Sequence, residues 1–169
     1  MIKYYISKNA AILFVGINPH FGSYSRGVPF SNNKMFWYLL SEAGIIKETR
    51  EFLKNDEKLK KLYTTISKKY GINFINIIDK PTKDVSQLKK GEEIKGVKRL
   101  AEIIKNKKPK VVCFIGKVTF SKFKGDNRFR FGVQSKIYNS IIYVMHFPIR
   151  GYASIRVNEL KTVKKLAGL

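Results

Sequence analysis

The sequence predicts an α/β protein, a three-layer α/β/α sandwich with a central, mainly parallel, four-stranded sheet. Two observations predict this class. Four short runs rich in apolar and β-branched residues alternate with segments whose apolar residues recur at helical spacing. The runs are also almost continuously apolar, which is typical of strands that helices cover on both faces.

The predicted strands are "AILFVG" (11–16), "INFINII" (72–78), "VVCFIG" (111–116) and "SIIYVMHF" (140–147). Amphipathic patterns predict helices over 32–44, 92–106 and 156–169. The charged stretch 47–70 predicts a further helix on the outside. The chain has 169 residues and neither repeats nor low-complexity tracts, so we expect a single domain over residues 1–169.

Charge is the strongest compositional signal. The chain has 34 Lys and Arg against 12 Asp and Glu, a net charge of +22. This bias indicates a polyanionic partner, with nucleic acid ahead of an acidic membrane, although surface lysines that only promote solubility remain an alternative. The acids gather between Glu42 and Glu102, whereas residues 1–41 contain none. This asymmetry favours one basic face.

Several classes are excluded by what the sequence lacks. No stretch is long and apolar enough to span a bilayer, and the short apolar N-terminal run lacks the cleavage site of a signal peptide. Cys113 is the only cysteine, and His20 and His146 are the only histidines. We therefore expect no disulfide, no metal, no cofactor and no membrane partner, and a cytoplasmic location that is nucleoid-associated in a prokaryotic source.

Polar residues follow three of the predicted strands. Ligands of open α/β sheets bind beyond the carboxyl ends of the strands, so we expect Asn18, His20, Lys117, His146 and Arg150 to share one edge. Lys117 sits where a backbone phosphate could meet a helix start, although a tight turn with an exposed lysine is an equal alternative.

Familiar catalytic patterns are missing from this edge. It contains no G-x-G-x-x-G, no P-loop, no acid in the loops beside either histidine, and one carboxylate, Asp79, where glycoside hydrolases use two. A reaction with a good leaving group needs fewer catalytic groups than these. Uracil leaves its N-glycosidic bond as a delocalised anion, so a neutral asparagine that holds one water could suffice.

The stretch "GINPHFGSYSRGVPF" (16–30) resembles the first motif of the mismatch-specific uracil/thymine-DNA glycosylases, family 2 of the uracil-DNA glycosylase superfamily. The similarity continues through "FW" (36–37), "INIIDKPT" (75–82) and "FIGK" (114–117), in the same order and spacing. The resemblance implies a uracil-DNA glycosylase-like fold.

Three positions carry the central roles that the resemblance implies. Asn18 matches the residue that positions the water, Phe30 the aromatic that stacks on the extruded base, and Asn76 an amide that reads the base. We expect Asn18 and Phe30 to face each other across one cavity. By themselves, the three residues could equally be a turn former, a core aromatic and a strand-end cap.

Other motif positions complete the implied pocket. Gly16, Ile17 and His20 would contact the substrate, Ile17 and His20 through their backbone groups, and Ser23 would lie beside the base.

The second motif, "HFPIRGYAS" (146–154), departs from the family pattern. Its first position is His146, which resembles the histidine that donates to a base oxygen elsewhere in the superfamily; a strand-end histidine satisfied by backbone is the alternative. Arg150 falls at the wedge position, where it fills the gap of the flipped nucleotide, contacts the orphan guanine or clamps a phosphate. Lys117, Tyr152 and Ser154 are expected to contact DNA.

We therefore expect a monomeric, monofunctional DNA glycosylase of base excision repair. It would flip uracil, or a mismatched thymine or another deaminated or damaged base, out of double-stranded DNA and hydrolyse the N-glycosidic bond. A non-catalytic nucleic-acid-binding protein that retains the fold is the alternative. The sequence does not determine which lesion is preferred or whether the protein contacts the base opposite the lesion.

Overall fold

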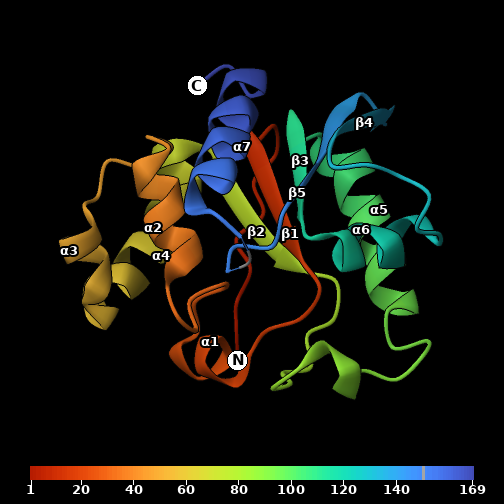
Figure 1. Ribbon diagram of the computed structural model, residues 1–169, viewed down its shortest axis with the longest axis horizontal. Coiled ribbons are helices and arrows are strands. Elements are labelled where there is room, and N and C mark those ends of the chain that lie inside the picture. Colours follow the sequence, from red (N-terminus) through yellow and green to blue (C-terminus); the bar gives the residue numbers. More distant parts are fainter. Residues whose placement is uncertain (150) are drawn as a thin grey trace.

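A computed structural model describes residues 1–149 and 151–169. In these ranges one five-stranded sheet has the order β2-β1-β3-β5-β4 (Figure 1). The strands are β1 (Ile12–Gly16), β2 (Ile72–Asn76), β3 (Val111–Ile115), β4 (Gly132–Ile137) and β5 (Ser140–Met145).

Helices cover both faces of the sheet. Phe14 and Phe74 point into a core shared with α2 (Met35–Glu42), α4 (Asp56–Tyr70) and α7 (Ala153–Leu166). Leu13 and Phe114 point the other way, toward α5 (Ile94–Lys107) and α6 (Lys117–Lys124). Side chains alternate between faces along a strand, so each buried strand feeds two cores. The α/β sandwich with a mainly parallel sheet is confirmed (Figure 1).

The count of four strands is wrong, because β4 pairs antiparallel with β5 at the sheet edge. None of the residues of its sequence, "GVQSKI", is buried, and its register with β5 shifts between Gln134 and Ile137. A short, irregular, half-solvated edge strand lacks the continuous apolar run that marks the central strands.

The helices follow the predicted patterns with three differences. The charged stretch 47–70 contains two helices, α3 (Arg50–Lys54) and α4, because Asn55 ends the first and caps the second by accepting from Lys58 N–H. A short helix, α1 (Phe21–Arg26), also lies within residues 16–30, where the sequence predicts only a loop. A 3₁₀ turn, η1, spans Val85–Gln87.

Four strands end at the same edge of the sheet. β1 is parallel to β2 and β3, and β3 is parallel to β5, with Gly16 opposite Asn76 and Ile115 opposite Met145. The segments that follow these strands therefore meet at the carboxyl edge. Figure 1 shows α1 and the N-terminus at this end, near the arrowheads of β1 and β2.

No helix in the described ranges is long and apolar enough to cross a membrane. In the same ranges, no three His, Cys, Asp or Glu side chains gather as the ligands of a metal ion would.

Gly96 provides a test of how closely α5 approaches Ile77, the residue that follows β2. A Cβ at this position would collide with the carbonyl oxygen of Ile77. We predict that Gly96→Ala lowers the free energy of unfolding by about 1–3 kcal/mol, measured by urea denaturation. In an unobstructed helix the same change would raise it by up to about 1 kcal/mol.

Lys95→Ala, one residue away and exposed, is the matched control and should change stability by less than about 0.5 kcal/mol. A more stable Gly96→Ala variant would show that α5 and Ile77 do not approach this closely.

Candidate functional site

Gly16, Phe30 and Asn76 meet at the carboxyl edge. Gly16 ends β1 and pairs in register with Asn76, the last residue of β2. A Cβ on Gly16 would collide with both Phe30 Cε1 and Asn76 Oδ1. The lack of a side chain at Gly16 therefore lets an aromatic ring and a carboxamide approach the same backbone position.

The Asn76 carboxamide is fully buried and only half satisfied. Its Nδ2 donates to Tyr4 Oη at 2.9 Å, whereas Oδ1 has no hydrogen-bond partner. Burial raises the pKa of Tyr4 to about 12, so the phenol is neutral at physiological pH. An unpaired buried acceptor costs about 1–3 kcal/mol, which makes Oδ1 a candidate contact for a ligand donor.

Arg99 of α5 fixes the end of β2. Its Nη2 donates to the carbonyl oxygen of Asn76 at 2.9 Å and to Asp79 Oδ1 at 3.0 Å, and its Nη1 donates to Asp79 Oδ2 at 2.6 Å. The hydrogen bonds to Asp79 hold the pKa of Arg99 above its usual value. The sequence offered no signal for this role, because Arg99 lies in a helix without a motif.

Phe30 has an unusual backbone conformation for an aromatic residue, with φ of 56°. Such left-handed residues cost energy and persist where the surroundings hold them. Here the neighbouring backbone is fixed on both sides of Phe30. Trp37 Nε1 donates to the carbonyl oxygen of Pro29 at 2.9 Å, and Ser31 N–H donates to Ser23 Oγ at 3.0 Å.

Ser23 is thus buried behind the Phe30 turn, where its hydroxyl supports the backbone. Arg26 also holds the backbone of this turn, because its Nη1 donates to the carbonyl oxygen of Ser31 at 2.5 Å. Ser23 therefore has a clear structural contact, and a position beside the base remains a prediction.

The Asn18 amide is held by the segment that follows β2. Its Nδ2 donates to Thr82 Oγ1 at 2.7 Å and to the carbonyl oxygen of Lys80 at 3.0 Å, with a longer bond of 3.4 Å to the Pro19 carbonyl oxygen. No hydrogen bond reaches Asn18 Oδ1 from the residues that the structure describes. The amide nitrogen is thus anchored and the oxygen is left as an acceptor.

Ile17 and His20 also lie at this edge. The carbonyl oxygen of Ile17 already accepts from Ile78 N–H at 2.8 Å. The His20 ring caps α1, because its Nδ1 accepts from Gly22 N–H at 3.2 Å. The carbonyl of Ile17 and the ring of His20 therefore have structural partners, and their predicted roles toward a substrate remain predictions.

His146, which follows β5, meets an acid that the loops do not supply. Its Nδ1 lies 3.1 Å from Oε1 of Glu159 in α7, and the same oxygen accepts the His146 backbone N–H at 3.1 Å. The sequence contains no acid in the loops beside His146, but Glu159 reaches it from thirteen residues further along. This partner is found only once α7 is packed against β5.

Phe131 brings Lys117 and His146 together. The Phe131 and His146 rings stack with centroids 3.5 Å apart and planes at 22°. Lys117, the first residue of α6, places its Nζ 4.9 Å from the centroid of Phe131. Two residues predicted to share the edge thus contact the same aromatic ring.

The second motif is only partly described, because Arg150 lies outside the described residues. Tyr152 and Ser154 are exposed at the start of α7. Arg156 is buried, unlike most arginines and lysines of a strongly basic chain. It donates to the Gly151 carbonyl oxygen at 2.6 Å and so supports this loop.

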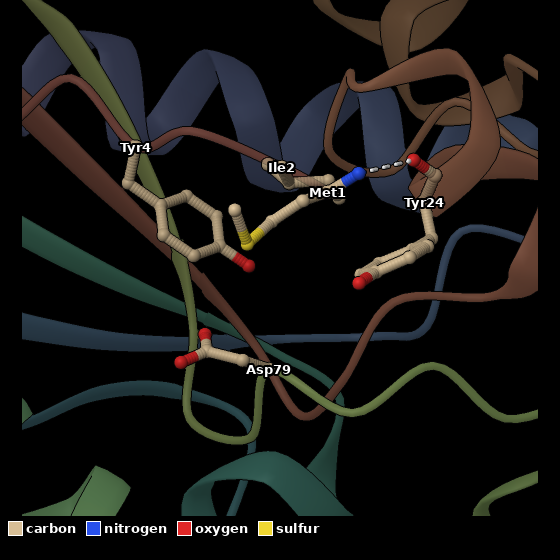
Figure 2. A pocket seen from close by; sticks show the side chains of 5 residues that line it. All are labelled: Met1, Ile2, Tyr4, Tyr24 and Asp79. Carbon is tan, nitrogen blue, oxygen red and sulfur yellow. Dashed lines mark hydrogen bonds between the residues drawn. The ribbon is translucent and has the colours of Figure 1, made fainter.

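A cavity of about 130 Å³ lies beside Tyr4 (Figure 2). It is lined by Met1, Ile2, Tyr4, Tyr24 and Asp79. Figure 2 shows the Tyr4 hydroxyl, the Met1 side chain and the Tyr24 ring around this space, with Asp79 below them.

The structure does not place Asn18 and Phe30 across this cavity. Neither residue lines it, because Phe30 lies against Gly16 and the Asn18 amide is bonded to residues 80 and 82. The cavity adjoins the buried carboxamide through Tyr4, which lines the cavity and bonds Asn76.

The structure thus defines an α/β protein whose parallel strands end at one edge, which is where ligands bind in open α/β sheets. The candidate site presents two anchored carboxamides, Asn18 and Asn76, and an aromatic ring, Phe30, which meets Asn76 at Gly16. A family model of the uracil DNA glycosylase superfamily matches residues 3–157. The chain therefore belongs to this superfamily, which indicates DNA as the substrate and DNA glycosylase activity in base excision repair.

The Phe30 turn yields a prediction about stability. Ser23→Ala leaves the Ser31 N–H without its acceptor, so we predict a loss of about 1–3 kcal/mol in the free energy of unfolding. Ser25→Ala, an exposed position on the same short helix, should change it by less than about 0.5 kcal/mol. Equal denaturation midpoints for the two variants would contradict the role given to Ser23.

Proposed function

We propose that the protein is a monofunctional glycosylase of the mismatch-specific uracil/thymine type, acting as a single-domain monomer that flips uracil out of duplex DNA. The observation that carries this proposal is the unpaired, buried Oδ1 of Asn76 beside the Phe30 ring. Uracil offers the donor that this oxygen lacks, its N3–H, together with a flat face for an aromatic ring.

The carboxamide of Asn76 would distinguish uracil from cytosine. One N–H of its Nδ2 is directed to Tyr4 Oη, which leaves the other for O4 of uracil while Oδ1 accepts from N3–H. Cytosine reverses both groups, with an acceptor at N3 and an amino group at C4. It would leave two buried polar pairs unmatched, which costs several kcal/mol.

Entry of the base requires a rearrangement in this proposal. Asn76 is fully buried, and Phe30 lies directly over Gly16. The incoming base displaces the Phe30 ring from Gly16 and then stacks on it. The left-handed backbone of Phe30 is consistent with a functional constraint on this turn.

The hydrolytic step is assigned to Asn18. Its Oδ1 accepts a hydrogen bond from the attacking water and aims the water at C1′ of the sugar. The C1′–N bond breaks, its electron pair leaves with the base, the water oxygen bonds to C1′, and the water proton passes to solvent. A neutral amide suffices because it positions the nucleophile and does not deprotonate it.

The remaining motif residues are assigned to the leaving base and the duplex. His146 faces the same edge and donates to an oxygen of the departing base. Lys117, Tyr152 and Ser154 contact the DNA backbone, and Arg150 fills the gap that the flipped nucleotide leaves.

Asn18→Ala tests the assignment of the water. We predict that it slows base release by on the order of 100-fold or more while duplex affinity stays within about twofold, because it removes positioning and leaves the DNA contacts. The measurement is single-turnover release from duplexes with uracil, hypoxanthine, ethenocytosine or mismatched thymine, followed by alkaline cleavage at abasic sites.

Asn106→Ala, an exposed asparagine of α5, is the matched control and should release base at the wild-type rate. Wild-type release by Asn18→Ala would refute the mechanism. A wild-type protein that binds DNA and releases none of the four bases would favour a non-catalytic binder.

Salt dependence tests the DNA contact of Lys117. Each neutralised phosphate contributes about 0.9 to the negative slope of log affinity against log salt. We predict that Lys117→Ala reduces this slope by about 0.9, measured by fluorescence anisotropy. Lys107→Ala, at the opposite end of α5 from the site, should leave the slope unchanged. Identical slopes for Lys117→Ala and the wild type would remove Lys117 from the interface.

A further inference from the structure

One contact sets the direction of the Asn76 carboxamide. Within the described parts of the chain, Tyr4 is its only hydrogen-bond partner: Tyr4 Oη accepts from Asn76 Nδ2 at 2.9 Å, and Asn76 Oδ1 is unpaired. The two ends of a carboxamide have nearly the same shape, so packing does not distinguish them, whereas one end donates and the other accepts. The Tyr4 hydroxyl therefore determines which end of Asn76 is left for a ligand.

A phenol by itself leaves this direction undecided, because its oxygen accepts from an amide nitrogen and its O–H donates to an amide oxygen. The carboxylate of Asp79 removes the ambiguity. It lines the same cavity as Tyr4, and Figure 2 shows it below the Tyr4 hydroxyl. Burial raises the pKa of Tyr4 to about 12, and the nearby charge of Asp79 adds to this rise. Hydroxyl dipoles turn in such a field, so the phenolic hydrogen faces Asp79 and a lone pair faces Asn76.

Arg99 holds Asp79 in this place. Its Nη1 donates to Asp79 Oδ2 at 2.6 Å and its Nη2 to Asp79 Oδ1 at 3.0 Å, while Nη2 also donates to the carbonyl oxygen of Asn76 at 2.9 Å. One guanidinium thus ties the carboxylate to the end of β2, the strand that carries the amide. Each carboxylate oxygen has more than one lone pair, so this ion pair leaves Asp79 able to attract the Tyr4 hydrogen.

Building on the proposed function, we propose that Tyr4 is a specificity-determining residue: its hydroxyl, oriented by Asp79, keeps Asn76 Oδ1 toward the base and thereby selects uracil over cytosine. The N3–H of uracil meets an acceptor in this arrangement, whereas N3 of cytosine is itself an acceptor and meets a second one. Without the hydroxyl, the terminal torsion of Asn76 has two equivalent directions, and one of them offers Nδ2 to cytosine. Tyr4 acts through Asn76 and is a positioning residue.

The affinities of two uncleavable duplexes test the role of Tyr4. One carries 2′-fluoro-2′-deoxyuridine and the other 2′-fluoro-2′-deoxycytidine, each opposite an abasic-site analogue, so that neither base has a pairing partner to leave. The wild type should bind the uracil duplex more tightly. Tyr4→Phe should lower the ratio of uracil to cytosine affinity by about tenfold or more, because it removes the hydroxyl and keeps the ring. The measurement is fluorescence anisotropy at one salt concentration.

Tyr5→Phe is the matched control. It removes a hydroxyl one residue away that makes no hydrogen bond within the described residues, and it should keep the wild-type ratio. Both affinities are measured on one preparation of each variant, so a loss of folded protein lowers both equally and cancels in the ratio. A Tyr4→Phe variant with the wild-type ratio, even if both affinities fall together, would overturn the role of Tyr4.

NMR of the free protein provides a readout that needs no DNA. The wild type should show a nuclear Overhauser effect between an Nδ2 proton of Asn76 and the Tyr4 ring protons beside the hydroxyl. In Asp79→Asn the charge that orients the phenol is lost, so this effect should weaken as the reversed amide becomes populated. Absence of the effect in the wild type would overturn the inference, and an unchanged effect in Asp79→Asn would overturn the orienting role of Asp79.

The outcomes separate this inference from the proposed function. A wild type that binds the uracil and cytosine duplexes with equal affinity would refute the reading of uracil by Asn76, on which the proposed function rests. A wild type that prefers uracil, with the same preference in Tyr4→Phe, would overturn the role of Tyr4 alone and leave the glycosylase proposal in place.

Discussion

The absence of a side chain at Gly16 is the constraint on which the candidate site depends. It lets the Phe30 ring and the Asn76 carboxamide reach one backbone position at the end of two parallel strands. Tyr4 and Arg99 then fix Asn76 from behind, so that only its Oδ1 lacks a partner. Any larger residue at Gly16 would separate these groups and remove the juxtaposition on which the proposed base recognition rests.

The carboxyl edge of the sheet carries chemically different side chains after β1 and after β5. Asn18 follows β1 and supplies a neutral amide, whereas His146 follows β5 and is paired with a carboxylate. β3 lies between these strands, so their backbones are about 10 Å apart. Under the proposed function, the nucleotide lies between a water held by Asn18 on one side and the ring of His146 on the other. In this proposal, the order of the strands separates the attacking water from the departing base.

The layered fold and the edge that carries the site follow from the sequence, because continuous apolar runs specify buried parallel strands. β4 was missed because none of its residues is buried, so it lacks a continuous apolar run. The motif residues mark the edge, but Tyr4, Arg99 and Glu159 lie in segments without motifs. Their roles depend on contacts over 72, 23 and 13 residues, which only the packed chain creates. Sequence patterns therefore locate the site, and tertiary packing supplies the groups that orient it.

The most direct measurement is a crystal structure of the protein with duplex DNA that carries a 2′-fluoro-2′-deoxyuridine, whose glycosidic bond resists hydrolysis. The account predicts a flipped uracil stacked on Phe30, with its N3 within hydrogen-bond distance of Asn76 Oδ1. A uracil that remains in the duplex or binds elsewhere, with Phe30 still lying over Gly16 and Asn76 still covered, would contradict it.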